Sequence, residues 1–341
     1  MTGGVFWYNG GNIDDKSCST TAKNDYGVQK KRRNCDMSMT KQARKVKRVF
    51  NRALFLPLKR LLYDAGLVKG SYIGPDGLVR LRKLEIYLTN GCNLKCKFCS
   101  HFNPYRRGIV ATETLVTSME TWSKKVRPKK FGLLGGEPLM HPDFPLLLRK
   151  ARECWATSRL IVTTNGLLVA PKGEALVDVL RETSAEVLLS EHLMDEKGRA
   201  TFAAARTILE NAKIPTTVIP SASRWKEYYS FDEQGKPLPC KSRPEASWTM
   251  CGPNTCFNLT NNKLYRCSIL ANAVCGWQEG ALGDEWKRTQ TYTPLEPTAT
   301  ADEIVRHLFL MTGPLPACSI CPETIRFVDA RQIATMEADR W

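Results

Sequence analysis

The chain has 341 residues, 43% of them hydrophobic and 25% charged, which is enough to bury the core of one large domain or two modest ones. No apolar run approaches the roughly 20 residues that span a bilayer, and the N-terminus lacks the apolar segment of a secretory signal. We therefore expect a cytoplasmic protein. Without a secretory signal, its 13 cysteines favour metal or cluster ligation over a disulfide framework.

The formal charge of +16 is concentrated near the N-terminus. Residues 1–36 are polar, glycine-rich and basic, which predicts a disordered N-terminus. Residues 37–81 form a predicted helical extension, in which Pro57 should kink the helix. Such a basic segment suits contact with a membrane surface, and a solvated helix face is the alternative. No nucleic-acid-binding motif accompanies the charge, so we do not expect a nucleic-acid partner.

Residues 82–222 alternate short apolar runs with amphipathic stretches, which predicts right-handed βαβ units and a parallel sheet. With a sixth strand expected near Trp225–Phe231, the natural candidate is an α/β fold, a partial (β/α)6 barrel. An open doubly wound sheet is the alternative. The expected strands are Leu84–Leu88, Phe131–Leu134, Leu160–Thr164, Glu186–Ser190 and Thr216–Ile219, and the expected helices are Thr112–Val126, Phe144–Ala156, Lys172–Arg181 and Glu196–Ala212.

Residues 223–341 form a predicted small Cys-rich C-terminal domain. The segment contains a predicted hairpin, Phe257–Thr260 and Lys263–Arg266, whose tight turn is Asn261-Asn262. It offers few apolar residues for a core, so we expect metal to hold it in part.

Three cysteines follow the first expected strand at C-x3-C-x2-C spacing: Cys92, Cys96 and Cys99. Such a loop can supply three thiolates to a [4Fe–4S] cluster and leave one iron open for a ligand. The competing interpretation is a zinc site that recruits His101 as a fourth ligand.

This loop resembles the defining motif of the radical S-adenosylmethionine (SAM) superfamily. The resemblance implies that the open iron binds SAM, and that the reduced cluster cleaves SAM to methionine and a 5′-deoxyadenosyl radical. It also implies that Phe98, just before the third cysteine, packs near the adenine.

Further landmarks of that family follow the later strands. Gly135, Gly136, Glu137 and Pro138 resemble the motif whose backbone and glutamate bind the SAM amino group; paired glycines permit close backbone approach, and a carboxylate complements an ammonium. Thr164 and Asn165 resemble the segment that lines the ribose. Ser190 and Glu191 resemble a polar position that contacts ribose or carboxylate.

A second set of cysteines lies in the C-terminal segment. A CxxC pair and the cysteines of the hairpin can supply four thiolates, which suits either a closed [4Fe–4S] cluster or structural zinc. Beside a radical SAM core the arrangement resembles the twitch/SPASM-like auxiliary-cluster domain. Five cysteines compete for four positions, and Cys256 is the one able to replace another: Cys251, Cys256, Cys267, Cys318 and Cys321.

By the same resemblance, the expected activity is hydrogen abstraction from a carbon of a sugar, glycoside or aminocyclitol, leading to epimerisation, dehydrogenation or deoxygenation. His101 is a candidate to bond a substrate hydroxyl, and Cys240, Cys256 or Cys275 to donate a hydrogen atom. We expect a flavodoxin- or ferredoxin-type electron donor and a pocket lined by charged or amide groups. The alternatives are modification of a ribosomally made peptide and a non-catalytic metal protein bound to nucleic acid.

Overall fold

The computed structural model describes residues 57–220, 225–251, 257–310, 313–328 and 334–336. Contacts divide the chain into Met1–Lys47 and Arg48–Trp341, and every described residue belongs to the second unit. The predictions for residues 1–36, most of the N-terminal helix and Cys256 lie outside the described residues. The end of that helix is present, since residues 57–64 are helical.

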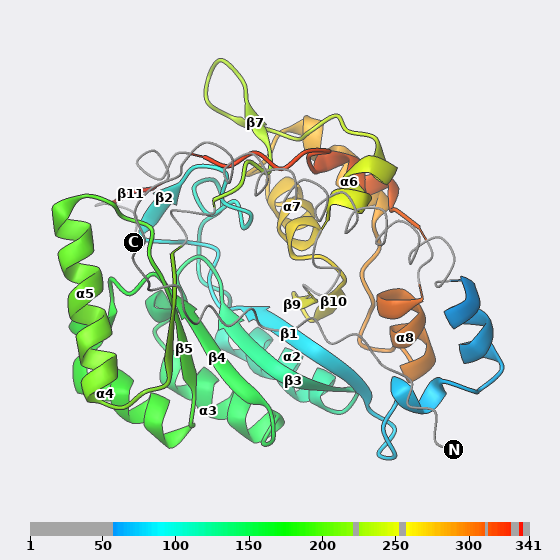
Figure 1. The fold of residues 1–341 in the computed structure, drawn as a ribbon, viewed down its shortest axis with the longest axis horizontal. Helices are drawn as coiled ribbons and strands as arrows, with labels where there is room; N and C mark the ends of the chain where they lie inside the picture. The colour runs from blue at the N-terminus through cyan, green and yellow to red at the C-terminus, as the bar shows by residue number, and fades with distance from the viewer. Residues whose placement is uncertain (1–56, 221–224, 252–256, 311–312, 329–333, 337–341) are drawn as a thin grey trace, which may run out of the picture. The chain divides into compact units, whose positions relative to one another are not determined.

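The main sheet has seven strands in the order β10-β9-β1-β3-β4-β5-β6 (Figure 1). All neighbours from β9 to β6 pair in parallel, and β10 pairs antiparallel with β9 at the edge. This is an α/β fold whose parallel strands are consistent with a partial barrel. The strands are β1 (Val79–Tyr87), β3 (Val126–Leu134), β4 (Arg159–Thr164), β5 (Glu186–Ser190), β6 (Thr216–Ile219), β9 (Asn258–Thr260) and β10 (Lys263–Tyr265).

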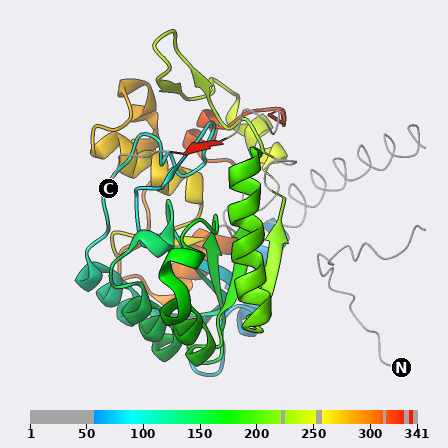
Figure 2. The same cartoon turned by 90° about the vertical axis from the view of Figure 1, so that its left-hand side faces the viewer.

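Helices between the parallel strands form a layer on one face of the sheet. Consecutive helices contact one another, and Figures 1 and 2 show them along the same side. The last four residues of β1 and of β3 are buried without alternation, as in a parallel strand covered on both faces, and Glu85 of β1 is the one charged residue among them. The helices are α2 (Thr112–Ser123), α3 (Phe144–Cys154), α4 (Val169–Glu182) and α5 (Glu196–Asn211).

The sixth barrel strand expected near Trp225–Phe231 is a wrong prediction. In that stretch only β7 (Ser230–Phe231) is a strand, and it pairs antiparallel with β8 (Pro237–Leu238) in a separate ribbon. The sixth parallel strand is β9, which arrives from the hairpin and pairs with β1 at the opposite edge from β6. The hairpin turn itself is confirmed: Asn261 and Asn262 have φ of 49° and 57°, as a tight turn between strands of this kind requires.

Most of the remaining elements lie beyond the carboxyl ends of the sheet strands, whereas α8 (Ala301–Phe309) lies beside the starting end of β1 (Figures 1 and 2). Their core is more apolar than expected from the sequence, because Trp286, Tyr292 and Leu270 form a second buried cluster with Phe102. The division into domains at residue 222 stays a prediction, and α8 packs into the main core through Ile304. These elements are β2 (Leu94–Cys96), α6 (Pro244–Met250), α7 (Ser268–Gln278), η4 (Asp284–Thr291), α8 (Ala301–Phe309), η5 (Pro316–Ile320) and β11 (Ala334–Met336).

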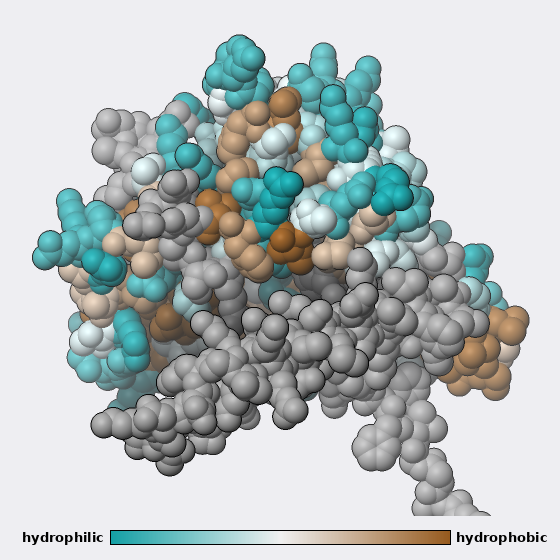
Figure 3. All heavy atoms as spheres, turned by 45° about the horizontal axis from the view of Figure 1, so that its top comes forward, coloured by the Kyte–Doolittle hydropathy of each residue, from teal (hydrophilic) through white to brown (hydrophobic). Residues whose placement is uncertain are grey.

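Some large apolar side chains face solvent at the N-terminal end of the described chain. Leu58, Leu61 and Leu67 are 48%, 66% and 74% exposed. Figure 3 shows hydrophobic side chains gathered at the right-hand edge, where Figure 1 draws the helix at residues 57–64. Among the described residues, no helix combines the length and the apolar character that a membrane span requires.

Candidate functional site

The three cysteines of the C-x3-C-x2-C loop line one cavity of about 180 Å³. The loop leaves β1, passes through Cys92, continues as the short strand β2 and turns back at Cys99. The opposite wall is formed where β3, β4 and β5 end, so the cavity lies at the carboxyl edge of the parallel sheet. Its other lining residues include Ser100, His101, Asn103, Gly135, Gly136, Thr163, Thr164, Asn165, Ser190, His192 and Trp225.

The thiols in this cavity are shielded from water. Burial raises the pKa of Cys92, Cys96 and Cys99, and the neighbouring thiols raise the pKa of Cys96 further. Without a cation nearby, the protein therefore favours neutral thiols over thiolates. The Sγ of Cys96 also lies 3.7 Å from Nδ1 of His192.

Gly135 and Gly136 are required by packing against the cluster loop as well as by the cavity that they line. A Cβ on Gly135 would lie 2.6 Å from the Thr89 carbonyl oxygen, and one on Gly136 would overlap the Gly91 carbonyl. The backbone of this turn is also bonded to the loop, since Gly136 N donates to Thr89 O and Glu137 N donates to Gly91 O. The pair thus holds the ends of β3 and β1 together.

Glu137 is fully buried and its carboxylate is engaged within the protein. It accepts hydrogen bonds from Thr164 Oγ1 at 2.7 Å, Asn165 N at 2.9 Å and Leu139 N at 3.1 Å. Burial raises its pKa to about 7, and these three donors lower it in part. The carboxylate fixes the end of β4 beside the glycine pair, and its predicted contact with a SAM ammonium stays a prediction.

Other predicted cofactor residues differ in their access to the cavity. Thr164, Asn165 and Ser190 line it, and Asn165 Nδ2 donates to Asn93 Oδ1 at 2.7 Å. Pro138 begins the short helix η2 (Pro138–Met140) and is buried. Phe98, Pro138 and Glu191 are not among the lining residues. Phe98 instead packs against the rings of Tyr229 and Phe231, with centroids 5.7 and 5.0 Å away.

His101 lines the cavity and is also bonded to the backbone, and its predicted bond to a substrate hydroxyl stays a prediction. Its Nδ1 lies 3.1 Å from the Gly135 carbonyl oxygen, which can only accept, so Nδ1 carries the proton and Nε2 is left as an acceptor. Burial lowers the pKa of His101 to about 4, so the ring is neutral. His192, Trp225 and Asn103 also line the cavity and were missed, because none stands in a motif; only the position of His192 just after a strand end hinted at it.

The second set of cysteines also meets at cavities. Cys251, Cys267, Cys318 and Cys321 line a cavity of about 60 Å³, together with Arg266. Three of them, Cys251, Cys267 and Cys321, also line a larger cavity of about 240 Å³ that reaches Ser100 of the first site. Burial and the neighbouring thiols raise the pKa of Cys321. These are the four cysteines preferred on sequence grounds, and their ligation stays a prediction.

Both sets of thiols suit the iron–sulfur clusters that the sequence implies. The first cavity has three soft sulfur donors from one loop, and the second has four from separate segments of the chain, so either set could supply cluster ligands. Among the described residues, no three His, Cys, Asp or Glu side chains converge on the position of a single metal ion.

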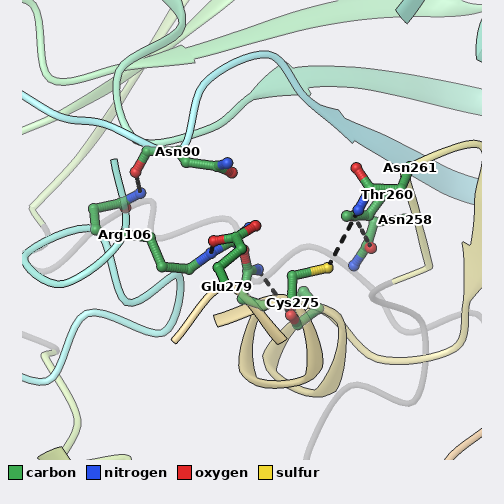
Figure 4. Close-up of polar contacts among 10 residues, drawn as sticks. Asn90, Arg106, Asn258, Thr260, Asn261, Cys275 and Glu279 are labelled. Carbon is green, nitrogen blue, oxygen red and sulfur yellow. Dashed lines mark hydrogen bonds and ion pairs between the residues drawn. The ribbon is translucent and has the colours of Figure 1, made fainter. Parts of the chain in front are cut away.

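Two of the three hydrogen-donor candidates, Cys240 and Cys275, lie among the described residues, and neither is part of these cavities. Cys240 is half-buried, with its Sγ 3.7 Å from the Tyr228 carbonyl oxygen. Cys275 is 1% exposed on α7, where Asn261 Nδ2 lies 3.8 Å from its Sγ (Figure 4). Neither lines any of the three cavities, so the described structure gives these thiols no route to a substrate there.

An ion pair between a buried arginine and a partly exposed glutamate attaches the loop after the cysteine triad to the end of α7. Arg106 bonds both carboxylate oxygens of Glu279 at 2.9 and 2.7 Å and also donates to Asn272 Oδ1 at 2.8 Å (Figure 4). The Arg106 side chain is 2% exposed. The two cysteine sites are therefore tied together through this contact.

Comparison with known proteins gives matches over the part of the chain that holds the first cavity. Residues 86–213 match the radical SAM superfamily. A GTP 3′,8-cyclase from Microcystis aeruginosa is 31% identical over 102 residues, which cover 28% of this chain and 30% of that protein. A probable GTP 3′,8-cyclase from Methanocella arvoryzae is 36% identical over 97 residues, or 28% and 31% of the two chains. The chain thus spans about a third of the length of these curated relatives.

Solved structures are similar only at a low level. BtrN in complex with AdoMet and 2-DOIA gives a TM-score of 0.37 at 14% identity over 61% of this chain and 84% of that one. Streptococcus suis SuiB bound to the precursor peptide SuiA gives 0.36 at 12% identity over 75% and 73%. Such scores carry no argument about this chain. The part of this chain that is similar to the radical SAM superfamily, residues 86–213, includes all three cysteines of the first cavity.

Proposed function

We propose that the chain is a radical SAM enzyme that cleaves SAM reductively and abstracts hydrogen from a carbon of a sugar, glycoside or aminocyclitol. The observation that carries the proposal is the cavity in which Cys92, Cys96 and Cys99 face the ends of β3, β4 and β5. A [4Fe–4S] cluster bound by the three thiolates would supply the electron for SAM cleavage.

The chain's own groups would hold SAM against that cluster. The Gly135–Gly136 turn and Asn165 present backbone and amide groups to the cavity, and Glu137 keeps these two segments in register. Ser190 adds a hydroxyl, and the neutral His101 adds an acceptor nitrogen at Nε2. Trp225 donates from Nε1 to the Lys97 carbonyl at 2.5 Å and so helps to shield the cluster loop from water.

The substrate would bind in the 240 Å³ cavity, which adjoins the first cavity at Ser100. Lys226, Glu227 and Ser268 offer the convergent donors and acceptors that hydroxyl or amino groups of a sugar or aminocyclitol need. The wall is not uniformly polar as expected, because Met250, Ile269, Pro322 and Ile325 also line it. An apolar wall of this kind suits the carbon face of a ring.

A second [4Fe–4S] cluster on Cys251, Cys267, Cys318 and Cys321 would border the same cavity. A bound substrate would then lie between the two cysteine sites. That position supports an oxidative outcome, because a cluster held by these cysteines would supply an acceptor for one electron of the substrate radical, whose proton would pass to solvent. A ferredoxin or flavodoxin would supply the reducing electron to the first cluster.

The first experiment measures iron, sulfide and 5′-deoxyadenosine in the anaerobically reconstituted chain. We expect about eight irons and eight sulfides, from two clusters. Replacing Cys92, Cys96 and Cys99 with Ala should remove about half the iron and abolish 5′-deoxyadenosine formation from SAM. Cys154→Ala is the matched control, since this half-buried thiol on α3 lines none of the cavities. Stoichiometric zinc without iron would contradict the proposal.

The substrate class is tested by deuterium transfer into 5′-deoxyadenosine. Glycosides and aminocyclitols deuterated at ring carbons should transfer the label, and the product should change by epimerisation, oxidation or loss of a hydroxyl. GTP belongs in the same series, because the curated relatives carry the name of GTP 3′,8-cyclases. Transfer from a peptide but from none of these rings would replace the sugar proposal with peptide modification.

A further inference from the structure

The small cavity lined by four cysteines contains one cation, Arg266. The residue follows β10 and precedes Cys267, and its side chain is largely buried. Its Nη1 atom is inaccessible to water and has no hydrogen-bond partner among the described residues. The backbone of Arg266 is fixed, because its N–H donates to the Tyr292 hydroxyl at 2.7 Å.

A buried guanidinium needs negative charge nearby. Arginine stays protonated in proteins, and taking an uncompensated charge out of water is costly. The cavity that Arg266 lines also presents four thiols, those of Cys251, Cys267, Cys318 and Cys321. No carboxylate is among its described lining residues. The anionic partners that the fold offers this guanidinium are therefore sulfur atoms.

The positive charge of Arg266 would also affect the reduction potential of a [4Fe–4S] cluster bound by the four sulfurs. Four thiolates bring one negative charge each, which outweighs the charge of a ferric–ferrous [4Fe–4S] core, and reduction adds another electron. A fixed positive charge beside the sulfurs stabilises the reduced state more than the oxidised state, so it raises the reduction potential. Removing the charge should therefore make the cluster harder to reduce.

We propose that Arg266 is a positioning residue that holds a positive charge against the second cysteine site and thereby raises the reduction potential of the cluster there. The inference rests on the second cluster of the proposed function. The positive charge of Arg266 would make the cluster a better electron acceptor, as an oxidative reaction in the neighbouring cavity requires.

The test isolates the second cluster in the full chain. Cys92, Cys96 and Cys99 are replaced with Ala, and the midpoint potential of the remaining iron is followed by electron paramagnetic resonance during an anaerobic redox titration. In this background Arg266→Gln should shift the potential to more negative values, and Arg266→Lys should keep most of the original potential.

Arg288→Gln is the matched control: Arg288 is exposed, and its Nη1 donates to Ser319 Oγ beside Cys318 at 3.2 Å. It should leave the potential unchanged, because solvent screens its charge.

An unchanged potential in Arg266→Gln, or equal shifts in Arg266→Gln and Arg288→Gln, would overturn the inference and leave the second cluster in place. If Arg266→Gln binds no iron while Arg266→Lys binds the full amount, the charge is required for loading, which supports the inference. Loss of iron from both variants overturns it. Absence of iron from the parent background is a separate result, in which the second cluster of the proposed function fails and Arg266 loses its role with it.

Discussion

At the scale of single residues, Glu137 determines how two strand ends meet. Its three hydrogen-bond donors belong to the segment after β3 and to the end of β4, and the residue is 1% exposed. A carboxylate in such a place is stabilised by its donors and destabilised by lost hydration. Burial is the larger effect, and the pKa rises to about 7.

This raised pKa predicts that Glu137 makes the chain less stable as the pH increases. The folded chain holds the proton up to about pH 7, whereas an unfolded chain releases it near pH 4.5. Between these values the folded state binds more protons, so the contribution of Glu137 is fully present below pH 4.5 and is lost as the pH approaches 7. The span corresponds to about 3 kcal/mol in the free energy of unfolding.

The measurement is urea unfolding at pH 4.5 and pH 7 for the wild-type chain and Glu137→Gln, at equal iron content. The wild type should lose about 3 kcal/mol more than the variant over this interval, since the amide does not titrate. Equal changes in the free energy of unfolding for the two proteins would mean that Glu137 is ionised over the whole pH interval.

At the scale of elements, the sequence was most informative where structure is local. The bounds of β5 and β6 agree with the expected strands, and the Asn261-Asn262 turn follows from the tolerance of asparagine for positive φ. The pairing of β9 with β1 was missed, because those strands are distant in the sequence and no local pattern encodes a partner. The expected strand near Trp225–Phe231 failed because the apolar residues there are aromatic side chains, and Tyr229 and Phe231 pack against the rings of Phe98 and Phe102 rather than into the main sheet.

The residues of the candidate site also fall into those that a local motif predicts and those that it does not. Its cysteines and glycines stand in recognisable motifs, so their positions were predictable. The approach of His192 to Cys96 depends on how the ends of β2 and β5 meet in space. The ion pair between Arg106 and Glu279 joins residues 173 positions apart, and neither stands in a motif. Contacts of this kind follow from tertiary packing and cannot be read from spacing.

The Arg106–Glu279 pair should contribute far more to stability than an exposed pair of the same geometry. Glu279→Gln leaves a guanidinium that is 2% exposed without its counter-charge, but Glu279 is itself 39% exposed, so the free energy of unfolding should fall by about 2 kcal/mol. Glu182→Gln is the matched control: Glu182 also bonds one arginine through both oxygens, but Arg149 and Glu182 are 52% and 53% exposed. It should leave unfolding almost unchanged. Urea denaturation compares the two variants. Equal losses in the free energy of unfolding would show that the burial of Arg106 does not matter.

At the scale of the whole molecule, the C-terminal elements have two sources of stability. The buried side chains of Trp286, Tyr292 and Leu270 form an apolar cluster with Phe102 from the cysteine loop. Three cysteines of the second site are carried instead by α6, η5 and the loops beside them, two short elements that contact each other: Cys251, Cys318 and Cys321. The fourth, Cys267, is the N-cap of α7. Ser247 on α6 also donates to the Cys321 carbonyl at 2.7 Å. Metal should therefore matter to these loops more than to α7.

Replacing Cys318 and Cys321 with Ala should empty the second site alone. Iron should fall by about half, and SAM cleavage at the first site should persist without productive turnover. Because bound metal contributes its binding free energy to folding, amide hydrogen exchange should accelerate in α6 and η5. It should change little in α7, which the apolar cluster and the Arg106–Glu279 pair hold in place. Cys154→Ala, which removes a thiol outside the cavities, is the control for both readouts.

Full iron content in the double variant would show that Cys318 and Cys321 are not ligands. Faster exchange throughout α7 would show that the cluster, rather than the apolar core, holds the C-terminal elements together.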